Sequence, residues 1–478
     1  MALLVDALRR AAESTPDKPA LIVADRTITF ADLDAMSSAA ARHLESVGVN
    51  RGDCVALHLS NGVEIVVAYF ACFKRGAIAL PINTRFKSQE IDYVLRHAGA
   101  VAYIGQPDLA REILGWPDHV RVRYVEGELV RLEPDTTYRT ESRDDDPAAV
   151  LYTSGTTARP KGVTHTQRTM MALAESSAAL LGDPNDVGLI PLPMVHMAAL
   201  LGVVSAIRAG ITIVTAPQFD PNVYLDAIER HRVTAMTGMP VFYRALAEAQ
   251  RHKPRDVRSM RMYAVGGDSV PTALQDQFQQ FFGRPLVEVY GLSEVVPVTM
   301  NRVDDVRCGS LGQLAPGVSV RIVDGELWVK APGVFVGYWN NPEATAQAFR
   351  DGWFLTGDLA HEAADGVFWF DGRKKEIIVR GGSNISPQEV EEAIYQHPAV
   401  AEVAVVGAPD ERWGEVVVAA VVLRDGHAIT ESDLLAFVRE RISLYKCPEQ
   451  LMFVAALPKG PTGKVLRRAV KESFVQRV

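Results

Sequence analysis

The 478-residue sequence has few cysteines and no long apolar segment. Its four cysteines show no spacing typical of metal ligands or of a disulfide framework, which predicts reduced thiols in a cytoplasmic protein. The longest apolar run, residues 194–207, is too short to span a bilayer and contains His196, so we expect a buried helix there. The first ten residues also lack the basic start and apolar stretch of a signal peptide. These absences argue against a secreted or membrane-spanning protein.

Positive charge is also scarce overall. The 58 Asp and Glu residues outnumber the 50 Lys and Arg residues, and the formal net charge of −8 gives no reason to expect a nucleic-acid partner. A local basic run between residues 251 and 261 could make weak peripheral contact with anionic lipid headgroups. The more ordinary interpretation of such a run is a solvated helix end and loop. Monomer and homodimer are both compatible with the sequence.

The pattern along the chain predicts an α/β protein. Residues 63–75 have helical spacing and stop at Gly76, before the apolar run 77–82, and the same order recurs around Gly210. This recurrence suggests two related α/β subdomains packed side by side, although glycine is the default helix stop and chance similarity gives the same pattern. From about residue 318, short strands alternate with tight turns, which predicts a small β subdomain.

The length exceeds one ordinary hydrophobic core, so we expect more than one domain. The chain becomes charged after residue 371 and then resumes helical and strand patterns. We therefore predict an N-terminal domain, residues 1–371, which holds the two α/β subdomains and the small β subdomain. A smaller, mobile α+β domain, residues 372–478, is predicted to follow.

A polar loop follows the apolar residues 148–151 and carries the strongest local signal for a ligand. Its glycine, hydroxyl groups and single lysine suit phosphate oxygens; the candidate phosphate ligands are Thr153, Ser154, Gly155, Thr156, Thr157 and Lys161. The loop is not a Walker A loop, because Lys161 precedes Gly162 and Pro160 occupies the place of the second glycine. The alternative is an ordinary polar surface loop.

Further motifs follow in a fixed order, and together with this loop they resemble the adenylate-forming superfamily of acyl-CoA synthetases, luciferases and adenylation domains. The motifs are Tyr290-Gly291-Leu292-Ser293-Glu294, Gly325-Glu326-Leu327, Gly337-Tyr338-Trp339-Asn340, Thr356-Gly357-Asp358-Leu359, the run from Asp371 to Ile378, and Pro461-Thr462-Gly463-Lys464. Each motif is weak alone, whereas the ordered set is specific and covers almost the whole chain.

The resemblance implies an ATP-dependent acid–thiol ligase that uses Mg²⁺ and coenzyme A. It assigns the catalytic lysine to Lys464, the Mg²⁺ ligand to Glu294, and the ribose contacts to Asp358 and Arg373. It places Tyr290, Gly291, Ser293, Gly267, Asp268 and Ser269 at the adenine. It also implies a hinge at Lys375, with Gly381 and Gly382 facing the adenylate later, when their small size lets pantetheine approach.

Elementary chemistry fits these roles, although each residue has an ordinary alternative. Lys464 is a cation that could neutralise charge developing on the α-phosphate, but it could equally be a solvated lysine in a basic tail. Glu294 is a hard oxygen ligand suited to Mg²⁺, or else an acid at a helix start. Asp358 can accept both ribose hydroxyl groups, or sit in a plain turn.

Three positions depart from the usual pattern. Ser293 replaces the more frequent threonine but retains the hydroxyl group. Ala158 stands where the phosphate loop generally has glycine, so backbone freedom is reduced there. Asp268 and Ser269 replace an Ala-Pro pair beside the adenine. A carboxylate pointing inward would repel phosphate, so we expect Asp268 to point away or to bind a polar group.

The region around His196 resembles bacterial fatty-acyl-CoA synthetases most closely, and in those enzymes His196 would lie at the acyl channel near the adenylate. The alternative is a packed core histidine. The expected acyl pocket is uncharged and consists of Met197, Met239, Val265, Val295, Val296 and Pro297. This composition favours a medium- or long-chain fatty acid over a dicarboxylate, because an unpaired buried carboxylate is costly. An aryl acid, or a carrier protein as acyl acceptor, remains an alternative.

Overall fold

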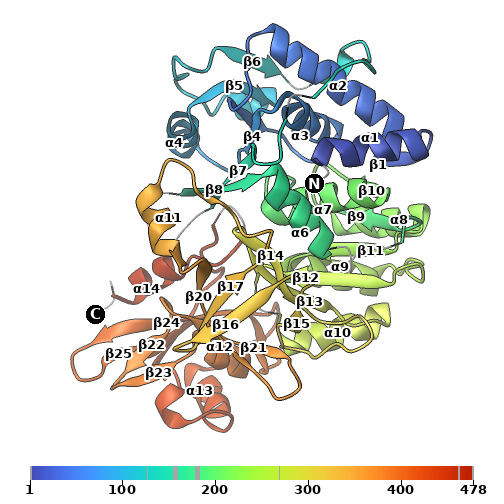
Figure 1. The fold of residues 1–478 in the computed structure, drawn as a ribbon. Coiled ribbons are helices and arrows are strands. Elements are labelled where there is room, and N and C mark those ends of the chain that lie inside the picture. Colours follow the sequence, from blue (N-terminus) through green and yellow to red (C-terminus); the bar gives the residue numbers. More distant parts are fainter. Residues whose placement is uncertain are drawn as a thin grey trace.

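We describe the protein from a computed structural model. The structure describes residues 3–125, 127–140, 142–153, 160–177, 183–268, 270–460 and 463–475. A large N-terminal part contains two α/β layers and a small β layer, and the C-terminal residues, orange to red in Figure 1, form a separate smaller unit beneath it. This arrangement confirms the predicted fold class. No helix in the described part of the chain is long and apolar enough to cross a bilayer.

The first α/β layer is built on a mainly parallel sheet. Its strands are β3 (Cys54–His58), β4 (Ile78–Pro81), β5 (Ala100–Gly105), β6 (Val122–Val125), β7 (Pro147–Thr153), β8 (Lys161–Thr166) and β18 (Gly337–Tyr338). They lie in the order β18-β8-β7-β4-β3-β5-β6. The associated helices are α2 (Phe30–Ser46), α3 (Val63–Arg75), α4 (Ser88–Ala98), α5 (Pro107–Ala110) and α11 (Pro342–Ala348). Every residue of α3 is buried, as its apolar sequence predicts.

The second layer has the strand order β15-β14-β13-β12-β11-β9-β10-β1-β2. Its strands are β1 (Pro19–Val23), β2 (Arg26–Thr29), β9 (Val187–Leu189), β10 (Thr212–Thr215), β11 (Ala235–Gly238), β12 (Met262–Gly266), β13 (Val287–Leu292), β14 (Val295–Met300) and β15 (Gln313–Leu314). The helices of this part of the chain are α1 (Leu4–Ser14), α6 (Gln167–Ser176), α7 (Met197–Ala209), α8 (Pro221–His231), α9 (Pro240–His252) and α10 (Thr272–Phe282).

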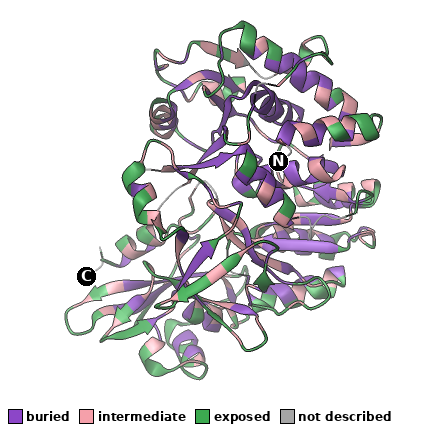
Figure 2. Cartoon of the chain, viewed as in Figure 1, coloured by how far each residue is buried: buried purple, intermediate pink, exposed green. Residues whose placement is uncertain are grey.

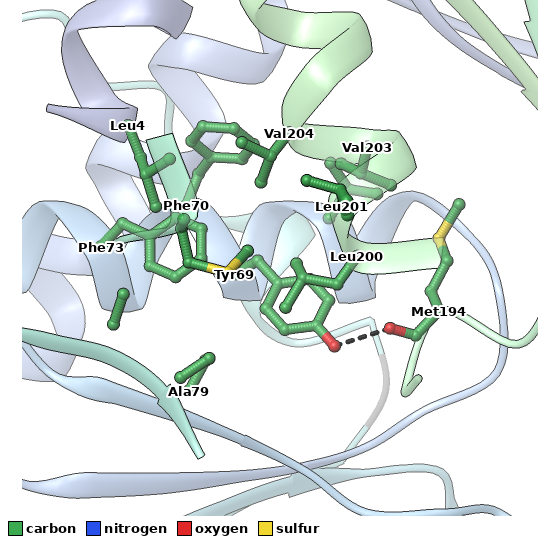
Figure 3. Close-up of a cluster of buried hydrophobic side chains, with 14 of the residues drawn as sticks. Leu4, Tyr69, Phe70, Phe73, Ala79, Met194, Leu200, Leu201, Val203 and Val204 are labelled. Atoms are coloured by element: carbon green, nitrogen blue, oxygen red, sulfur yellow. Dashed lines mark hydrogen bonds between the residues drawn. The ribbon is translucent and has the colours of Figure 1, made fainter. Parts of the chain in front are cut away.

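The two layers share one hydrophobic core, in which α3 of the first packs beside α7 of the second (Figure 3). The hydroxyl group of Tyr69 on α3 donates a hydrogen bond of 2.7 Å to the carbonyl oxygen of Met194, just before α7. Both helices end at a left-handed glycine, Gly76 with φ 73° and Gly210 with φ 68°, and a strand follows each. The predicted helix–glycine–strand unit is therefore present in both layers. A largely buried helix is present as expected, but it begins at Met197 rather than at residue 194, because His196 has extended backbone and is the N-cap.

A third, antiparallel layer follows in the chain. It contains β16 (Ser319–Val323), β17 (Glu326–Lys330), β19 (Phe349–Arg350), β20 (Trp353–Glu362) and β21 (Phe368–Arg373). The C-terminal unit combines β22 (Ile378–Arg380), β23 (Ser383–Ile385), β24 (Val400–Asp410), β25 (Gly414–Leu423) and β26 (Gln450–Phe453) with α12 (Pro387–Tyr395), α13 (Glu431–Arg439) and α14 (Arg467–Val475). Figure 2 shows buried residues concentrated in the central strands, while exposed residues are frequent in this C-terminal unit.

Candidate active site

The phosphate-loop motif lies between β7 and β8. Thr153 ends β7, Lys161 begins β8, and the two residues are cross-strand partners, so the intervening segment is the connection of a β-hairpin. Thr153 and Lys161 are both half-buried. The other predicted phosphate ligands, Ser154, Gly155, Thr156 and Thr157, lie outside the described residues, as do Ala158 and Ser269. The pairing fixes both ends of the loop at one edge of the first sheet.

Lys161 meets the predicted magnesium ligand through a tyrosine. The ammonium nitrogen of Lys161 lies 4.8 Å from the ring centroid of Tyr338, and the hydroxyl group of Tyr338 donates a hydrogen bond of 2.8 Å to Glu294. Burial raises the pKa of the Glu294 carboxyl, while the hydrogen bond from Tyr338 and the charge of Lys161 lower it. A half-buried carboxylate oxygen therefore lies close to the lysine that follows the loop.

His165 holds the segment that carries Glu294 by a hydrogen bond to its backbone. Its Nε2 lies 2.8 Å from the carbonyl oxygen of Ser293, and burial lowers the pKa of the imidazole to about 4. The ring is therefore neutral at pH 7, and Nε2–H donates this bond. At Gly291 an added Cβ would lie 2.7 Å from the Cβ of Val296, so any larger residue would displace the strand that follows.

A second cluster joins Tyr290, Asp358 and Arg373. Asp358 is only 3% exposed; it accepts a hydrogen bond of 2.6 Å from the Tyr290 hydroxyl group and lies 3.3 Å from the Nε of Arg373. Burial raises the pKa of Asp358, and Arg373 opposes this rise. The strands supply the geometry, because Asp358 on β20 and Arg373 on β21 are register partners. The predicted ribose residues are thus neighbours of the predicted adenine-stacking ring.

Lys464 lies within electrostatic reach of this second cluster. Its side chain keeps exposed surface, yet removal from water lowers its pKa and the charge of Arg373 lowers it further. Three carboxylates oppose the lowering: Asp268, Asp358 and Glu376.

His196 lies within electrostatic reach of Lys464. The residue precedes α7 and is half-buried. Desolvation, followed by the positive charges of Lys464 and Arg85, lowers the pKa of His196 to about 4. Its ring is therefore a neutral imidazole at pH 7, able to donate or accept a hydrogen bond.

The adenine-side loop begins where β12 ends at Gly266. An added Cβ at Gly266 would lie 2.4 Å from the carbonyl oxygen of Val289, and Gly267 has φ 82°, so both positions require glycine. Asp268, which follows, is exposed, and its charge acts on Lys464 and Arg467 of the C-terminal unit. The unusual carboxylate is therefore close to two cations.

The predicted acyl-pocket residues differ in exposure. Met197, Val265, Val295 and Pro297 are buried, whereas Met239 and Val296 are half-buried. Val265 packs in a core cluster with Tyr243 and Phe278. A separate apolar crevice of about 360 Å³, including space open to solvent, is lined by Leu189, Ile190, Leu192, Ala198, Gly202, Met236 and Thr237, among others, and by none of the six predicted pocket residues. Only about 20 Å³ of it can hold the centre of a water molecule, so the crevice is narrow.

The predicted hinge and coenzyme A residues lie at the start of the C-terminal unit. Lys375 is exposed and follows β21, and Gly381 and Gly382 form the turn between β22 and β23 with φ 55° and 84°. A Cβ at Gly381 would lie 2.8 Å from the ring of Trp413. These glycines contact their own domain in this placement, whereas Lys464 is the residue close to Asp358.

Several residues of the site had no role in the sequence-based prediction. Tyr338 stood inside a recognised motif, and its aromatic hydroxyl group was a usable signal. Ala198 and Gly202 could have been found from their four-residue spacing on the predicted helix. Glu376 stood in the recognised run from Asp371 to Ile378 without a role of its own. Arg85 gave no local signal, because its partner His196 is distant in sequence.

Comparisons with known proteins agree with this geometry. The model of the family described as AMP-binding enzyme matches residues 8–339, and that of the AMP-binding enzyme C-terminal domain matches residues 389–464. An indoleacetate–CoA ligase of Aromatoleum aromaticum is 34% identical over 97% of this chain and 96% of that relative. The long-chain-fatty-acid–CoA ligase FadD13 of Mycobacterium tuberculosis is 33% identical over 94% of each chain. A crystal structure of ATP-bound MatB from Rhodopseudomonas palustris superposes with a TM-score of 0.91 at 29% identity, covering 98% of this chain and 99% of that one.

The fold and the site define an adenylate-forming enzyme. The chain belongs to the AMP-binding enzyme family, with both its large domain and its C-terminal domain matched. It is an AMP-forming acid–thiol ligase of the acyl- or aryl-CoA class.

Proposed function

We propose that the enzyme joins a monocarboxylic acid with an apolar body to coenzyme A in two steps. In the first step a carboxylate oxygen attacks the α-phosphorus of ATP, the bond from that phosphorus to the bridging oxygen breaks, and pyrophosphate leaves. In the second, the thiolate of coenzyme A attacks the acyl carbonyl carbon and AMP leaves. The observation that carries this proposal is the Tyr290–Asp358–Arg373 cluster, in which Asp358 accepts a hydrogen bond of 2.6 Å from Tyr290 and lies 3.3 Å from Arg373, with Lys464 of the C-terminal unit within its electrostatic reach.

The residues divide between binding and charge neutralisation. Asp358 is suited to accept hydrogen bonds from the ribose hydroxyl groups, and Lys161 and Lys464 to neutralise phosphate charge. Glu294 offers one carboxylate beside Lys161, which fits Mg²⁺ because this ion is commonly held by one or two carboxylates together with substrate phosphates. When bound, Mg²⁺ would neutralise charge on the phosphate oxygens. We assign to His196, whose imidazole is neutral at pH 7, a hydrogen bond to the acid that adds no charge.

The apolar crevice supports a fatty acid as the first candidate substrate. Ala198, Gly202 and Thr237 keep exposed surface there, while the remaining lining is aliphatic. No Asp, Glu, Lys or Arg lines the described crevice, so a second carboxylate on the acid would be left unpaired.

An aryl acid is the second candidate, and one observation favours it. The relative from Aromatoleum aromaticum is named for indoleacetate, and its similarity to this chain equals or exceeds that of the long-chain ligase. Aliphatic and aryl acids therefore have comparable support.

Peripheral membrane contact has weaker support. In the basic run, Arg255 lies 2.9 Å from Asp226, Arg258 lies 2.8 Å from Asp256, and Arg251 lies 2.6 Å from Glu248. A lipid surface would have to compete with these ion pairs, so membrane contact stays a prediction.

A panel of acids tests the proposed substrate class. Pyrophosphate release is measured with acetate, butyrate, octanoate, palmitate, benzoate, indoleacetate and malonate, each with and without coenzyme A. For an alkyl-binding crevice, kcat/KM should rise with chain length until the crevice is full, by up to about 0.8 kcal/mol per buried methylene group. Preference for malonate would contradict an apolar pocket, and preference for the aromatic acids would select the second candidate. Acyl-AMP formation without thioester formation would point to a carrier protein as acceptor.

A further inference from the structure

Helix α12 of the C-terminal domain carries two adjacent carboxylates with different partners. Glu391 is buried and lies 3.0 Å from the Nη2 of Arg467, and it also accepts a hydrogen bond of 2.8 Å from the backbone N–H of Val405. Arg467 stands three residues after Lys464 and also contacts Glu376 at 3.1 Å, beside the predicted hinge. Glu391 therefore fastens the segment that carries Lys464 to α12.

Glu392 points to the other domain. Its carboxylate accepts a hydrogen bond from the backbone N–H of Thr272, the first residue of α10, at 3.4 Å. The preceding residue, Pro271, supplies no side-chain cap. The first backbone N–H groups of a helix lack partners within it and carry partial positive charge, so a carboxylate is stabilised there. The first turn of α10 contains no acidic residue. The negative charge at its N-terminus comes instead from Glu392 on α12.

A second contact crosses the same boundary. The guanidinium group of Arg244 on α9 donates a hydrogen bond of 3.2 Å to the carbonyl oxygen of Ala401, near the start of β24. The two contacts hold α12 and β24 against α9 and α10 of the N-terminal part. Since α10 follows the adenine-side loop directly, this docking surface adjoins the nucleotide end of the site.

We propose that Glu392 is a positioning residue that docks α12 on the N-terminus of α10 and thereby holds Lys464 at the adenylate-forming position. The connection runs from α10 through Glu392 to Glu391, Arg467 and Lys464. This inference rests on the proposed role of Lys464 in the first half-reaction. The contact is long, exposed and near the carboxyl group of Glu288, so it is weak enough to break when the domain rotates.

Two variants at this position test the role. Glu392→Gln removes the charge, and Glu392→Asp keeps it on a shorter side chain. Acid-dependent pyrophosphate release is measured separately from thioester formation with supplied acyl-AMP. We expect Glu392→Gln to lower kcat for pyrophosphate release by about two- to five-fold with KM for ATP little changed, which is the size of an exposed charge at a helix terminus. Thioester formation should stay at the wild-type rate, and Glu392→Asp should recover part of the loss.

Glu472→Gln is the matched control, because Glu472 pairs with Arg468 inside α14 and the change in charge is the same. The ratio of the wild-type kcat for pyrophosphate release to that of Glu392→Gln should also be smaller at high salt than at low salt, because salt screens exposed charges. Equal loss of both half-reactions would show a merely structural role, and unchanged pyrophosphate release would show no role; either result overturns the inference. Lys464→Ala is assayed alongside. If that variant still releases pyrophosphate normally, the proposed lysine role fails, independently of Glu392.

Discussion

Replacing Asp358 by alanine should lower kcat/KM for ATP without unfolding the protein. Asp358 is nearly fully buried, and its carboxylate is bound by Tyr290 and Arg373, two residues that remain after the change. If the same carboxylate accepts a ribose hydroxyl group, the variant loses at least one charge-assisted hydrogen bond. Such a bond is worth about 1.5–3 kcal/mol, which corresponds to a loss of roughly 10- to 150-fold.

The assay can isolate the ribose contact by changing the nucleotide as well as the residue. Wild-type enzyme is compared with Asp358→Ala, each with ATP and with 2′-deoxy-ATP, by pyrophosphate release at subsaturating nucleotide. Wild type should discriminate against the deoxy nucleotide, whereas the variant should use both nucleotides almost equally. This double comparison cancels effects that are common to both nucleotides, such as a shift of Tyr290.

Asp304→Ala is the control, because Asp304 is an exposed carboxylate that also pairs with an arginine, Arg302, at 3.0 Å. It should leave both kcat/KM values unchanged. Undiminished discrimination between the two nucleotides in Asp358→Ala would refute the ribose assignment, even if overall activity fell. In that case Asp358 would act only by holding Tyr290 and Arg373.

Two further predictions concern Lys464 and pH. Lys464→Ala should slow pyrophosphate release by two to three decades, because one transition-state charge contact is worth about 3–4 kcal/mol. Thioester formation from supplied acyl-AMP should continue. Loss of both steps would contradict the assignment. Burial lowers the pKa of His58 and of His165 to about 4, so between that value and the unfolded value near 6.5 the unfolded chain binds more protons. The free energy of unfolding, measured in urea, should therefore fall as the pH decreases through this window, by up to about 3 kcal/mol per histidine. The His165→Gln variant should show a smaller fall. A free energy of unfolding that does not change with pH would contradict the burial argument.

The sequence predicted the local elements best where several signals coincide. Helix α3 has the predicted bounds, Val63–Arg75, because a continuous apolar run meets a glycine that can adopt left-handed φ. The sheet to which the N-terminal strands belong could not be predicted in this way. β1 joins the second sheet by pairing with β10, so that Leu21 lies opposite Ile213, although the first layer follows it directly in the chain. Such pairing depends on packing between distant segments and has no local signature.

In the site, too, the sequence identified the residues but not the contacts between them. Recognised motifs named Lys161 and Glu294, but the link between them depends on Tyr338. Tyr338 reaches both because β18 adds to the edge of the first sheet, where Tyr338 pairs with Val163. A two-residue strand is too short to predict, and its register is set by the neighbouring strand. Motifs therefore identified the residue types, while tertiary pairing determined which of them act together.

The charge balance around Lys464 indicates how a nucleotide would stabilise this placement. Removal from water and the charge of Arg373 lower the pKa of the Lys464 ammonium group, and Asp268, Asp358 and Glu376 oppose that lowering. A triphosphate beside Lys464 would bring several negative charges and favour the charged lysine further. Departure of pyrophosphate would remove most of that stabilisation. A placement that the charge of the nucleotide stabilises suits the rotation that we predict for the C-terminal domain between half-reactions.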